Sequence, residues 1–348
     1  MESAEQANVI YSIDIDGNPS CINAFPSGHF RDVTLEGAIL TSTYNYSSSS
    51  KSRTGGIFLF NPCSNLKAIL AQKVDSYDSS FSCHMSYVSL PGVVYTTWIR
   101  TSDYYAAISV TAQLGVSVDR VVADDTSAPR LQHCSVIDLD NATGGVGLSL
   151  CVNDDSGSLC SVTSSDGYVY LIENGMQTMK WRAHNMETWT SSFVPGNSNL
   201  LLTGSDDSTV KLFDTREGTS PLYTLKHHSY GVTALKFMQD NTNIFYSGSF
   251  DCRLYQFDIR NLVTPVSNSL LEGPIWNLDY INRHRIHIAG CHDGAFVYDT
   301  DLNGVPTSLV KRLFLEDCLI YGATHVSVDK EPIYTSCNFY KKKVIFWQ

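Results

Sequence analysis

Residues 181–193 read WRAHNMETWTSSF, and residues 200–214 read LLLTGSDDSTVKLFD. The chain then repeats this pattern as HHSYGVTALKF at 227–237 and IFYSGSFDCRLYQFD at 244–258. Each copy holds short apolar runs separated by a turn of small residues and aspartate, and such runs predict β-strands. The rest of the chain is therefore best interpreted as weaker copies of this unit.

The two copies have a fixed spacing. Asp207 and Asp251 mark equivalent turns 44 positions apart, and Phe-Asp pairs end the copies at 213–214 and 257–258. A period of about 40–45 residues with an aromatic–Asp ending is typical of a WD40 blade. One blade cannot bury its faces alone, so the repeat predicts an all-β protein, a seven-bladed WD40 β-propeller that forms a single domain over 1–348.

The same register places the remaining blades. We expect them at roughly 20–61, 81–112, 146–174, 187–214, 231–258, 274–299 and 319–347. The last strand of the chain has no partner after it, whereas 8–16 reads as a strand at the start. We therefore expect the strand at 8–16 to pair with the last blade and close the ring, which removes an open sheet edge.

Two segments fit the repeat less well. The low-complexity stretch SSSSKSRTGG at 47–56 lies inside the first blade, and we expect it to be a mobile insert. Residues 120–145 are expected to contain an outer strand and polar loops. No stretch has the period of a long amphipathic helix.

Composition limits the classes of partner. The net charge is −11, which argues against a nucleic-acid binder because such proteins need a basic face for phosphates. A net-acidic protein is compatible with a cationic ligand or partner. The 43% hydrophobic content is enough for a packed core, and the low charged content of 17% suits short strands.

Ten cysteines are scattered singly, without a C-x-x-C pair or a Cys/His cluster at zinc spacing. We therefore expect reduced cysteines, no structural metal and no cofactor. No signal peptide and no transmembrane segment is recognised, so we expect a cytoplasmic protein without membrane contact. A closed propeller without exposed edges also favours a monomer.

Some polar residues fit an ordinary structural role. In WD40 blades a His before the first strand, a Ser or Thr in the second strand and an Asp in the following turn bond together. His228 with Asp251, and His184 with Asp207, occupy these positions. Buried polar groups must be paired, so we interpret both pairs first as ties within a blade.

Other residues depart from the repeat. His292 lies in the turn of the sixth blade, next to Asp293, where it is available for proton transfer near neutral pH. Its structural alternative is a rim histidine bonded to a neighbouring loop. Cys337 is expected at the equivalent turn of the seventh blade, as a packed residue or a nucleophile. Trp276 and Tyr321 begin inner strands, where they would form a ligand wall or fill the channel.

Familiar enzyme signatures are absent from the sequence. It has no G-x-S-x-G elbow, no G-x-x-x-x-G-K-[ST] loop and no G-x-G-x-x-G after a strand. The residues alone therefore lead to a WD40 propeller that serves as a binding platform.

A more specific likeness runs along the second half of the chain, and more weakly through its first 150 residues, where Thr43-Tyr44 and GGIFLF at 55–60 fit. The segments are WRAHNMETW at 181–189, GSDDSTVKLFDTR at 204–216, HHSYGV at 227–232, GSFDCRLYQFDIRN at 248–261, EGPIWNLDY at 272–280, AGCHDGAF at 289–296, IYGA at 320–323 and TSCNFYKKKVIFW at 335–347. In this order they resemble the WD-repeat diphthine methyl esterase family, also called diphthine methyltransferase.

The resemblance implies a reaction in diphthamide biosynthesis. The family removes a methyl ester from the methylated diphthine on elongation factor 2, which would make this factor the partner and diphthine and methanol the products. The substrate carries a quaternary ammonium, which suits aromatic side chains at the mouth of a channel in an acidic protein. Candidate substrate-binding residues are Trp276, Tyr321, His184, Trp189 and Asp206.

Ester cleavage needs an activated nucleophile and a stabilised oxyanion, and two mechanisms remain open. In the first, His292 is a general base for water, oriented by a carboxylate such as Asp293 or Asp251. In the second, Cys337 is the nucleophile beside a histidine. We expect the first, and we keep His228 as a further catalytic candidate.

Three non-enzymatic readings stand beside the esterase. The main one is a WD40 scaffold that binds a partner protein on its rim, because a fold does not determine a function. A propeller that binds a methylated or acidic peptide at its channel is a close variant. A small-molecule binder in the channel is the third.

Overall fold

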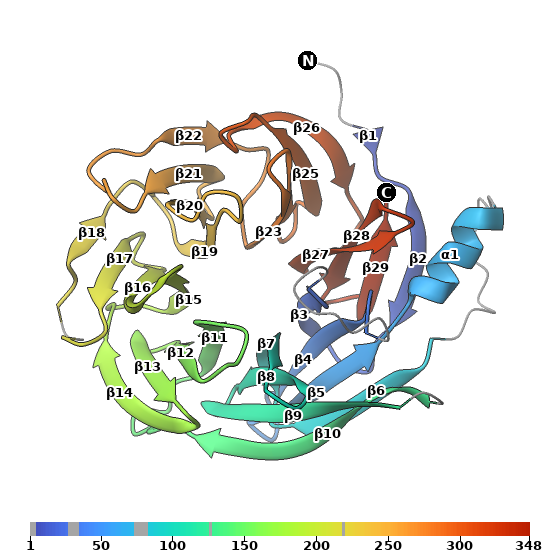
Figure 1. Cartoon of the computed structure of the whole chain (residues 1–348), viewed down its shortest axis with the longest axis horizontal. Coiled ribbons are helices and arrows are strands. Elements are labelled where there is room, and N and C mark those ends of the chain that lie inside the picture. Colours follow the sequence, from blue (N-terminus) through green and yellow to red (C-terminus); the bar gives the residue numbers. More distant parts are fainter. Residues whose placement is uncertain (1–4, 27–34, 73–82, 125–126, 218–219) are drawn as a thin grey trace.

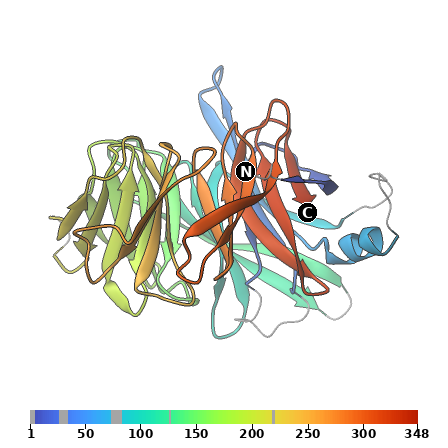
Figure 2. The same ribbon diagram turned by 90° about the horizontal axis from the view of Figure 1, so that it is seen from above.

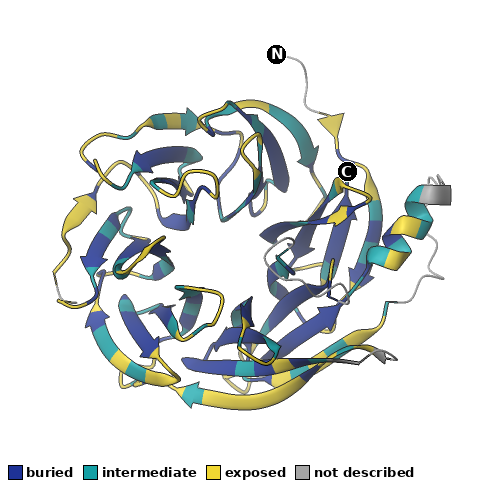
Figure 3. Ribbon diagram, in the orientation of Figure 1, coloured by how far each residue is buried: buried dark blue, intermediate teal, exposed yellow. Residues whose placement is uncertain are grey.

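The computed structural model describes residues 5–26, 35–72, 83–124, 127–217 and 220–348. Seven sheets, antiparallel apart from one short edge strand, stand side by side around a central channel (Figure 1). The seven-bladed β-propeller predicted from the repeat is therefore confirmed. Each sheet runs from an inner strand at the channel to an outer strand at the circumference. The buried residues concentrate on the inner and middle strands, whereas the exposed ones lie in the loops and, among the strands, mainly on the outer ones (Figure 3).

The first four blades follow one another along the chain. From the inner to the outer strand they are β3 (Pro19–Ala24), β4 (Ile39–Ser47), β5 (Ser52–Phe60) and β6 (Met85–Leu90); β7 (Val93–Arg100), β8 (Tyr105–Thr111), β9 (Gly115–Asp124) and β10 (Ser127–Asp138); β11 (Gly147–Val152), β12 (Leu159–Ser164), β13 (Tyr168–Glu173) and β14 (Met176–Arg182); and β15 (Thr188–Val194), β16 (Asn197–Ser205), β17 (Val210–Asp214) and β18 (Tyr223–Leu225).

The last three blades include strands from the start of the chain. They are β19 (Val232–Phe237), β20 (Ile244–Ser249), β21 (Arg253–Asp258) and β22 (Ser267–Leu270); β23 (Asn277–Asn282), β24 (Arg285–Ala289), β25 (Ala295–Thr300) and β26 (Pro306–Leu313), with β1 (Glu5–Gln6) beside β26; and β27 (Ile320–Val328), β28 (Glu331–Asn338), β29 (Lys343–Trp347) and β2 (Val9–Asp14).

The ring is closed by the pairing of β2 with β29, as predicted from the unpaired last strand. The two strands are antiparallel, with Ile13 opposite Val344 and Tyr11 opposite Phe346. The rings of Tyr11 and Phe346 stack with centroids 5.6 Å apart. The pairing therefore joins the two ends of the described chain through backbone bonds and packed side chains.

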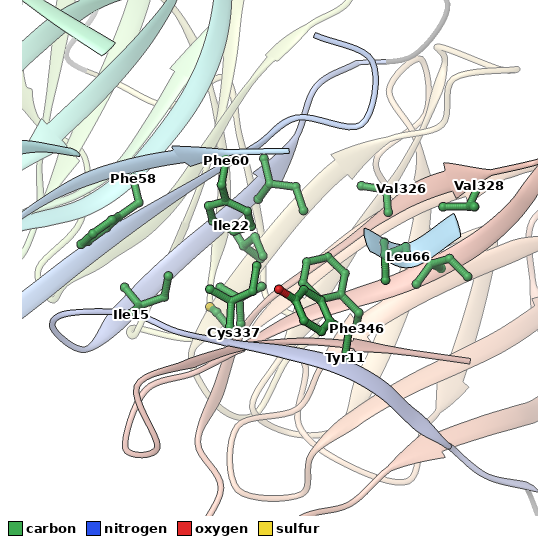
Figure 4. Close-up of a cluster of buried hydrophobic side chains, with 14 residues drawn as sticks. Tyr11, Ile15, Ile22, Phe58, Phe60, Leu66, Val326, Val328, Cys337 and Phe346 are labelled. Carbon is green, nitrogen blue, oxygen red and sulfur yellow. The ribbon is translucent and has the colours of Figure 1, made fainter. Parts of the chain in front are cut away.

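A hydrophobic cluster at this closure also joins the first blade to the seventh (Figure 4). Tyr11 and Phe346 pack there with Ile22 of β3, with Phe60 of β5 and with Val326 of β27. Large-to-small changes in such cores cost several kcal/mol because they leave cavities. The closing strand pair and the junction between two blades thus share one core.

One helix lies outside the ring, against this cluster (Figure 1). Helix α1 (Cys63–Gln72) follows β5, and its Leu66 is fully buried in the cluster of Figure 4. The Asn61 side chain accepts a hydrogen bond from the Cys63 backbone N–H at 3.0 Å, which caps the start of the helix. Among the described residues, no helix is long and apolar enough to cross a membrane.

Two expectations for the first blades need correction. The strand expected to open a blade at 81–112 is β6, which instead pairs with β5 as the outer strand of the first blade. Its alternating exposure suits an outer strand, and the inner strand of the second blade begins at Val93. Residues 81–82 of that expected range, and 125–126 of the segment 120–145, lie outside the described residues.

The stretch at 47–56 is not an irregular insert. It forms the end of a long hairpin in which β4 and β5 stay paired as far as Ser47 and Ser52. Gly55 and Gly56 lie within β5, where an added Cβ would fall 1.9 Å and 2.1 Å from backbone carbonyl oxygens. These two glycines therefore allow neighbouring backbones to approach closely.

The expected ties within blades are present. His228 Nε2 lies 2.8 Å from Ser247 Oγ, and His228 Nδ1 lies 3.0 Å from Asp251 Oδ2. His184 Nε2 lies 2.8 Å from Thr203 Oγ1 and its Nδ1 lies 2.9 Å from Asp207 Oδ2. Both imidazole nitrogens are engaged in each blade, so these histidines hold the rim loops in place.

A third buried histidine lies at the junction of the sixth and seventh blades. His287 Nδ1–H donates to the Thr324 carbonyl at 3.0 Å, and His287 Nε2 lies 3.4 Å from Ser336 Oγ. Ser336 Oγ in turn accepts a hydrogen bond from Trp347 Nε1 at 3.2 Å. Burial lowers the pKa of His287 to about 4, more than the nearby Asp279 raises it. The neutral imidazole of His287 thus has a structural role, because it links the sixth blade to the seventh.

The His228 tie gives a first stability test. His228→Ala removes two hydrogen bonds and leaves the buried Ser247 hydroxyl without this partner, so we expect a loss of about 2–3 kcal/mol in the free energy of unfolding. Urea unfolding would measure it. The neighbouring His227 is exposed, and His227→Ala should cost clearly less. Equal losses for the two variants would contradict the tie.

The neutral His287 gives a pH test. Its pKa in the folded protein lies below the usual value of about 6.5, so the unfolded chain binds a proton that the folded protein does not. Stability should be unaffected by this group above about pH 6.5 and should fall as the pH drops towards 4, by about 2 kcal/mol near pH 5. Urea midpoints of the protein and of His287→Gln would measure this. The idea fails if both show the same decline with pH.

Candidate active site at the channel mouth

The turns between the second and third strands of each blade lie on the same rim as the loops that enter the inner strands. This follows from the antiparallel order of the strands, and backbone bonds show it. Asp206 N–H donates to the Glu187 carbonyl at 3.0 Å, and Phe339 N–H donates to the Leu319 carbonyl at 2.9 Å. We call this side of the ring the upper rim. The turn of His292, between β24 and β25, belongs to it.

A cavity of about 470 Å³ occupies the channel below the upper rim. Residues of the inner strands of all seven blades line it. Four aromatic side chains stand at its mouth, and we call them the aromatic collar: Trp189, Trp276, Tyr321 and Phe339. Trp276 and Tyr321 were expected to line or fill the channel, and the structure places both at the wall of an open cavity.

The rings of the collar form a continuous row. The centroids of Trp189 and Trp276 are 5.1 Å apart, those of Trp276 and Tyr321 5.0 Å, and those of Tyr321 and Phe339 5.3 Å. Trp189 Nε1–H donates to the exposed Asp206 carboxylate at 3.2 Å. Four of the expected substrate-binding residues thus lie together: Trp189, Asp206, Trp276 and Tyr321. The row offers π-faces for a cation.

The Tyr321 hydroxyl remains a proton donor at neutral pH. Burial raises the pKa of Tyr321 to about 12. A phenol that keeps its proton can donate a hydrogen bond to a developing oxyanion, which a phenolate cannot do.

His292 is exposed on the rim, at the end of the same row of rings. Phe339 and Tyr340 are 5.7 Å apart, and Tyr340 and His292 are 6.2 Å apart. His292 Nδ1 lies 3.0 Å from the Cys318 carbonyl oxygen. A carbonyl accepts only, so Nδ1 carries the hydrogen, and in the neutral ring the lone pair is on Nε2. The side chain is therefore oriented as a base.

The turn that carries His292 is tightly constrained. Gly294 has φ of +96°, and a Cβ there would fall 2.0 Å from the Leu313 carbonyl oxygen. Cys291 has φ of +53°, which is uncommon for a residue with a side chain. Cys291 also forms a bridge with Ile320, at the start of the next inner strand. These constraints fix the position of His292 beside the seventh blade.

The group that orients His292 is not the expected carboxylate. Asp251 is bonded to His228 in the neighbouring blade. Asp293 is half-buried beside His292, and its carboxylate has no hydrogen-bond partner among the residues that the structure describes. The backbone carbonyl of Cys318 performs the orienting role instead. This contact could not be read from the sequence, because any residue type supplies a carbonyl.

Cys337 does not fit the role of a nucleophile. It lies in β28 rather than in a turn, and it is fully buried in the cluster of Figure 4. Burial raises the pKa of its thiol above the usual value, which keeps the thiolate scarce. The structural alternative, a packed residue, describes Cys337 correctly.

His184 and His228 are also removed from the chemistry. Both are buried with their two ring nitrogens engaged, and neither has a free lone pair. Asp207 and Asp251 serve as their partners. Although burial alone raises the pKa of Asp251, hydrogen bonds from His228 and the Ser229 N–H lower it to about 2.

A polar pair deeper in the channel was not predicted from the sequence. His325 Nδ1 on β27 lies 2.8 Å from Asp279 Oδ2 on β23. Burial raises the pKa of Asp279, but the hydrogen bond and charge of His325 lower it more, so the carboxylate is ionised. Lys236 and Asp279 both line the cavity. The alternation of side chains along a strand could have predicted this pair. Asp279 is two residues from Asn277 and His325 is four residues from Tyr321, so each is expected to face the channel with that residue.

The deep pair is separated from the aromatic collar. His325 lies four residues along β27 from Tyr321, which is roughly 13 Å at about 3.3 Å per residue. No group of three or more His, Cys, Asp or Glu side chains that could hold a metal is found in the part of the chain that the structure describes. The collar and His292 therefore form the more accessible site.

A family model for "WD domain, G-beta repeat" matches residues 175–214 and 219–258, which are the two copies that define the register. Solved propellers agree with the fold. The WD40 β-propeller domain of Doa1 superposes with a TM-score of 0.69 at 14% identity, covering 98% of this chain and 97% of that one. A chain of the mitotic checkpoint complex superposes with a TM-score of 0.66 at 12% identity, covering 100% and 94%.

Curated relatives share one name. Diphthine methyltransferase of Schizosaccharomyces pombe is 28% identical over 204 residues, 56% of this chain and 61% of that protein. Diphthine methyltransferase of Homo sapiens is 23% identical over 282 residues, 78% of this chain and 61% of that protein. The matched region thus spans about three fifths of each relative's length. With the WD repeats, these similarities mark the chain as a WD-repeat protein similar to the diphthine methyltransferases.

Proposed function

We propose that the chain takes part in diphthamide biosynthesis by hydrolysing the methyl ester of methylated diphthine on elongation factor 2. The products are diphthine and methanol. The observation that carries the proposal is the row of aromatic rings that runs from the channel mouth to the exposed His292. The relatives named diphthine methyltransferase support the substrate class.

The collar suits the cation of this substrate. A quaternary ammonium has no N–H to donate, so aromatic faces and carboxylates are the groups that recognise it. Trp276, Tyr321 and Phe339 supply faces at the cavity mouth, and Asp206 supplies a nearby negative charge held by Trp189.

The ester lies close to the cation in this substrate, and this distance favours His292 over His325 as the general base. The ester carbonyl carbon is two bonds from the quaternary nitrogen. A cation held at the collar thus places the ester near the rim, where His292 lies at the end of the ring row. His325 lies deeper in the channel and would require the cation to pass the collar.

The hydrolysis proceeds through water. His292 Nε2 takes a proton from a water molecule as its oxygen attacks the ester carbonyl, and the Nδ1–H bond to the Cys318 carbonyl supports the resulting imidazolium. The Tyr321 hydroxyl, which keeps its proton at neutral pH, donates a hydrogen bond to the oxyanion. Collapse of the tetrahedral intermediate breaks the bond to the methoxy oxygen, which takes the proton from His292 and leaves as methanol.

A scaffold that binds a partner protein on the rim is the second candidate function. It is favoured by apolar side chains that are exposed on the upper rim, such as Tyr230 and Tyr340. The two functions differ in methanol release from an excess of modified elongation factor 2. An enzyme releases many equivalents, whereas a scaffold releases none.

His292→Ala tests the proposed base. We expect methanol release to fall by about two to four orders of magnitude, because general-base assistance is removed. The matched control is His284→Ala, which removes an exposed histidine from the first turn of the same blade, on the opposite rim. The control should keep full activity. Undiminished turnover by folded His292→Ala would remove His292 from the mechanism.

Trp276→Leu tests the collar. Leucine keeps the apolar character but has no π-face, so inhibition by tetramethylammonium should weaken roughly threefold to thirtyfold. Inhibition by a neutral tert-butyl compound of similar shape should change little. Competition assays against modified elongation factor 2 would measure both. A parallel loss for the charged and the neutral inhibitor would show that Trp276 contributes packing and no cation recognition.

A further inference from the structure

Five large apolar side chains are exposed on the upper rim. They come from loops and turns at equivalent places in blades four to seven, and their exposed fractions lie between 44% and 65%. We call them the apolar arc: Met186, Tyr230, Phe250, Phe314 and Tyr340. Scattered exposed apolar residues are ordinary, but several gathered beside one cavity mark a binding surface.

The apolar arc contacts the aromatic collar at two of its residues, Phe250 and Tyr340. The rings of Phe250 and Trp276 are 6.3 Å apart, and those of Tyr340 and Phe339 are 5.7 Å apart. A molecule that covers the arc would therefore also cover the cavity mouth. Tyrosine, phenylalanine and methionine are the residue types enriched in the centres of protein interfaces.

The β4–β5 hairpin stands on the same side of the ring. Its turn joins the second and third strands of the first blade, and Figure 2 shows the blue hairpin projecting beyond the ring. Tyr44, in β4, lines the cavity, and Arg53 Nε–H donates to its hydroxyl at 3.2 Å. Arg53 also lies 5.3 Å above the ring of Tyr46, which is 54% exposed. The hairpin thus rises from the edge of the cavity as an ordered wall.

Negative charges accompany the apolar arc. Asp206, Glu316 and Asp317 are exposed on the loops and turns that carry the arc, and Asp293 is half-buried there. Lys341 in the same region lies 3.6 Å from Asp317 and is offset by it. Lys226 and Lys342 are also exposed on these loops and turns, so the acidic groups beside the collar that have no lysine partner among the described residues, Asp206 and Asp293, are the ones that would face a basic partner.

We propose that the apolar arc and the β4–β5 hairpin form a docking face for a folded protein that inserts a basic loop between them. The tip of this loop carries the quaternary ammonium into the collar. The identity of the tip rests on the proposed function, whereas the docking face itself rests on exposure, charge and the projecting hairpin. A protein partner is favoured over a free small molecule because the arc extends well beyond the cavity.

The test compares two double variants of the full chain. Tyr230→Ser with Phe250→Ser removes two apolar residues from the arc. Val263→Ser with Leu302→Ser is the matched control, because these exposed residues lie in loops between third and fourth strands, on the opposite rim. All four side chains are exposed, and thermal unfolding would confirm that both variants keep the fold.

Two readouts separate docking from chemistry. With elongation factor 2 that bears methylated diphthine, we expect the arc variant to raise KM about tenfold to a hundredfold and to leave kcat within about twofold. Direct binding of the factor, measured by calorimetry, should weaken by the same factor. The control variant should match the unmodified chain in both measurements.

Each outcome decides one of the two proposals. Unchanged KM and unchanged binding in the arc variant would overturn the docking face. A fall in kcat alone would also overturn it, because it would assign the arc to the chemical step. If the unmodified chain binds the factor without releasing methanol, and the arc variant loses that binding, the docking face holds and the proposed hydrolysis fails.

Discussion

The closure of the ring by β2 and β29 is the constraint on which the rest of the structure depends. Each blade alone has two apolar faces, and only a complete ring covers both faces of every blade. The hydrophobic cluster around Tyr11 and Phe346 joins the closing strands to the first blade and to helix α1. The channel, the collar and the upper rim keep their geometry because this junction holds the circle at a fixed circumference.

Buried polar networks set the loops of the upper rim within that frame. In the fourth and fifth blades a histidine uses both nitrogens to join a strand to a turn. In the sixth blade the equivalent turn carries His292, which bonds to a carbonyl of the next blade and leaves Nε2 free. His292 takes the turn position that Asp206 and Phe250 hold in the fourth and fifth blades, and all three residues are exposed. A histidine at this position places a base beside the collar without altering the fold.

Much of the fold could be predicted because the repeat is local and periodic. The turns at Asp207 and Asp251 gave the register, and His292 was found because it breaks that register. Features that depend on contacts between blades could not be predicted in the same way. The Cys318 carbonyl that orients His292 has no sequence signature, and β6 was assigned to the wrong blade because an outer strand resembles any other exposed strand. Cys337 was predicted to lie in a turn, but it is the second-to-last residue of β28 and lies in the core.

The pairing of β2 with β29 also has a consequence for biosynthesis. Asp14 lies opposite Lys343, so the first part of this ring to leave the ribosome pairs with the last. Until β29 emerges, Tyr11 and the apolar face of the first blade lack their final cover. Such long-range pairing slows folding and leaves apolar surface open to wrong contacts. The ring therefore stays an open arc until its last strand has been made, and the unfinished edge is exposed during that time.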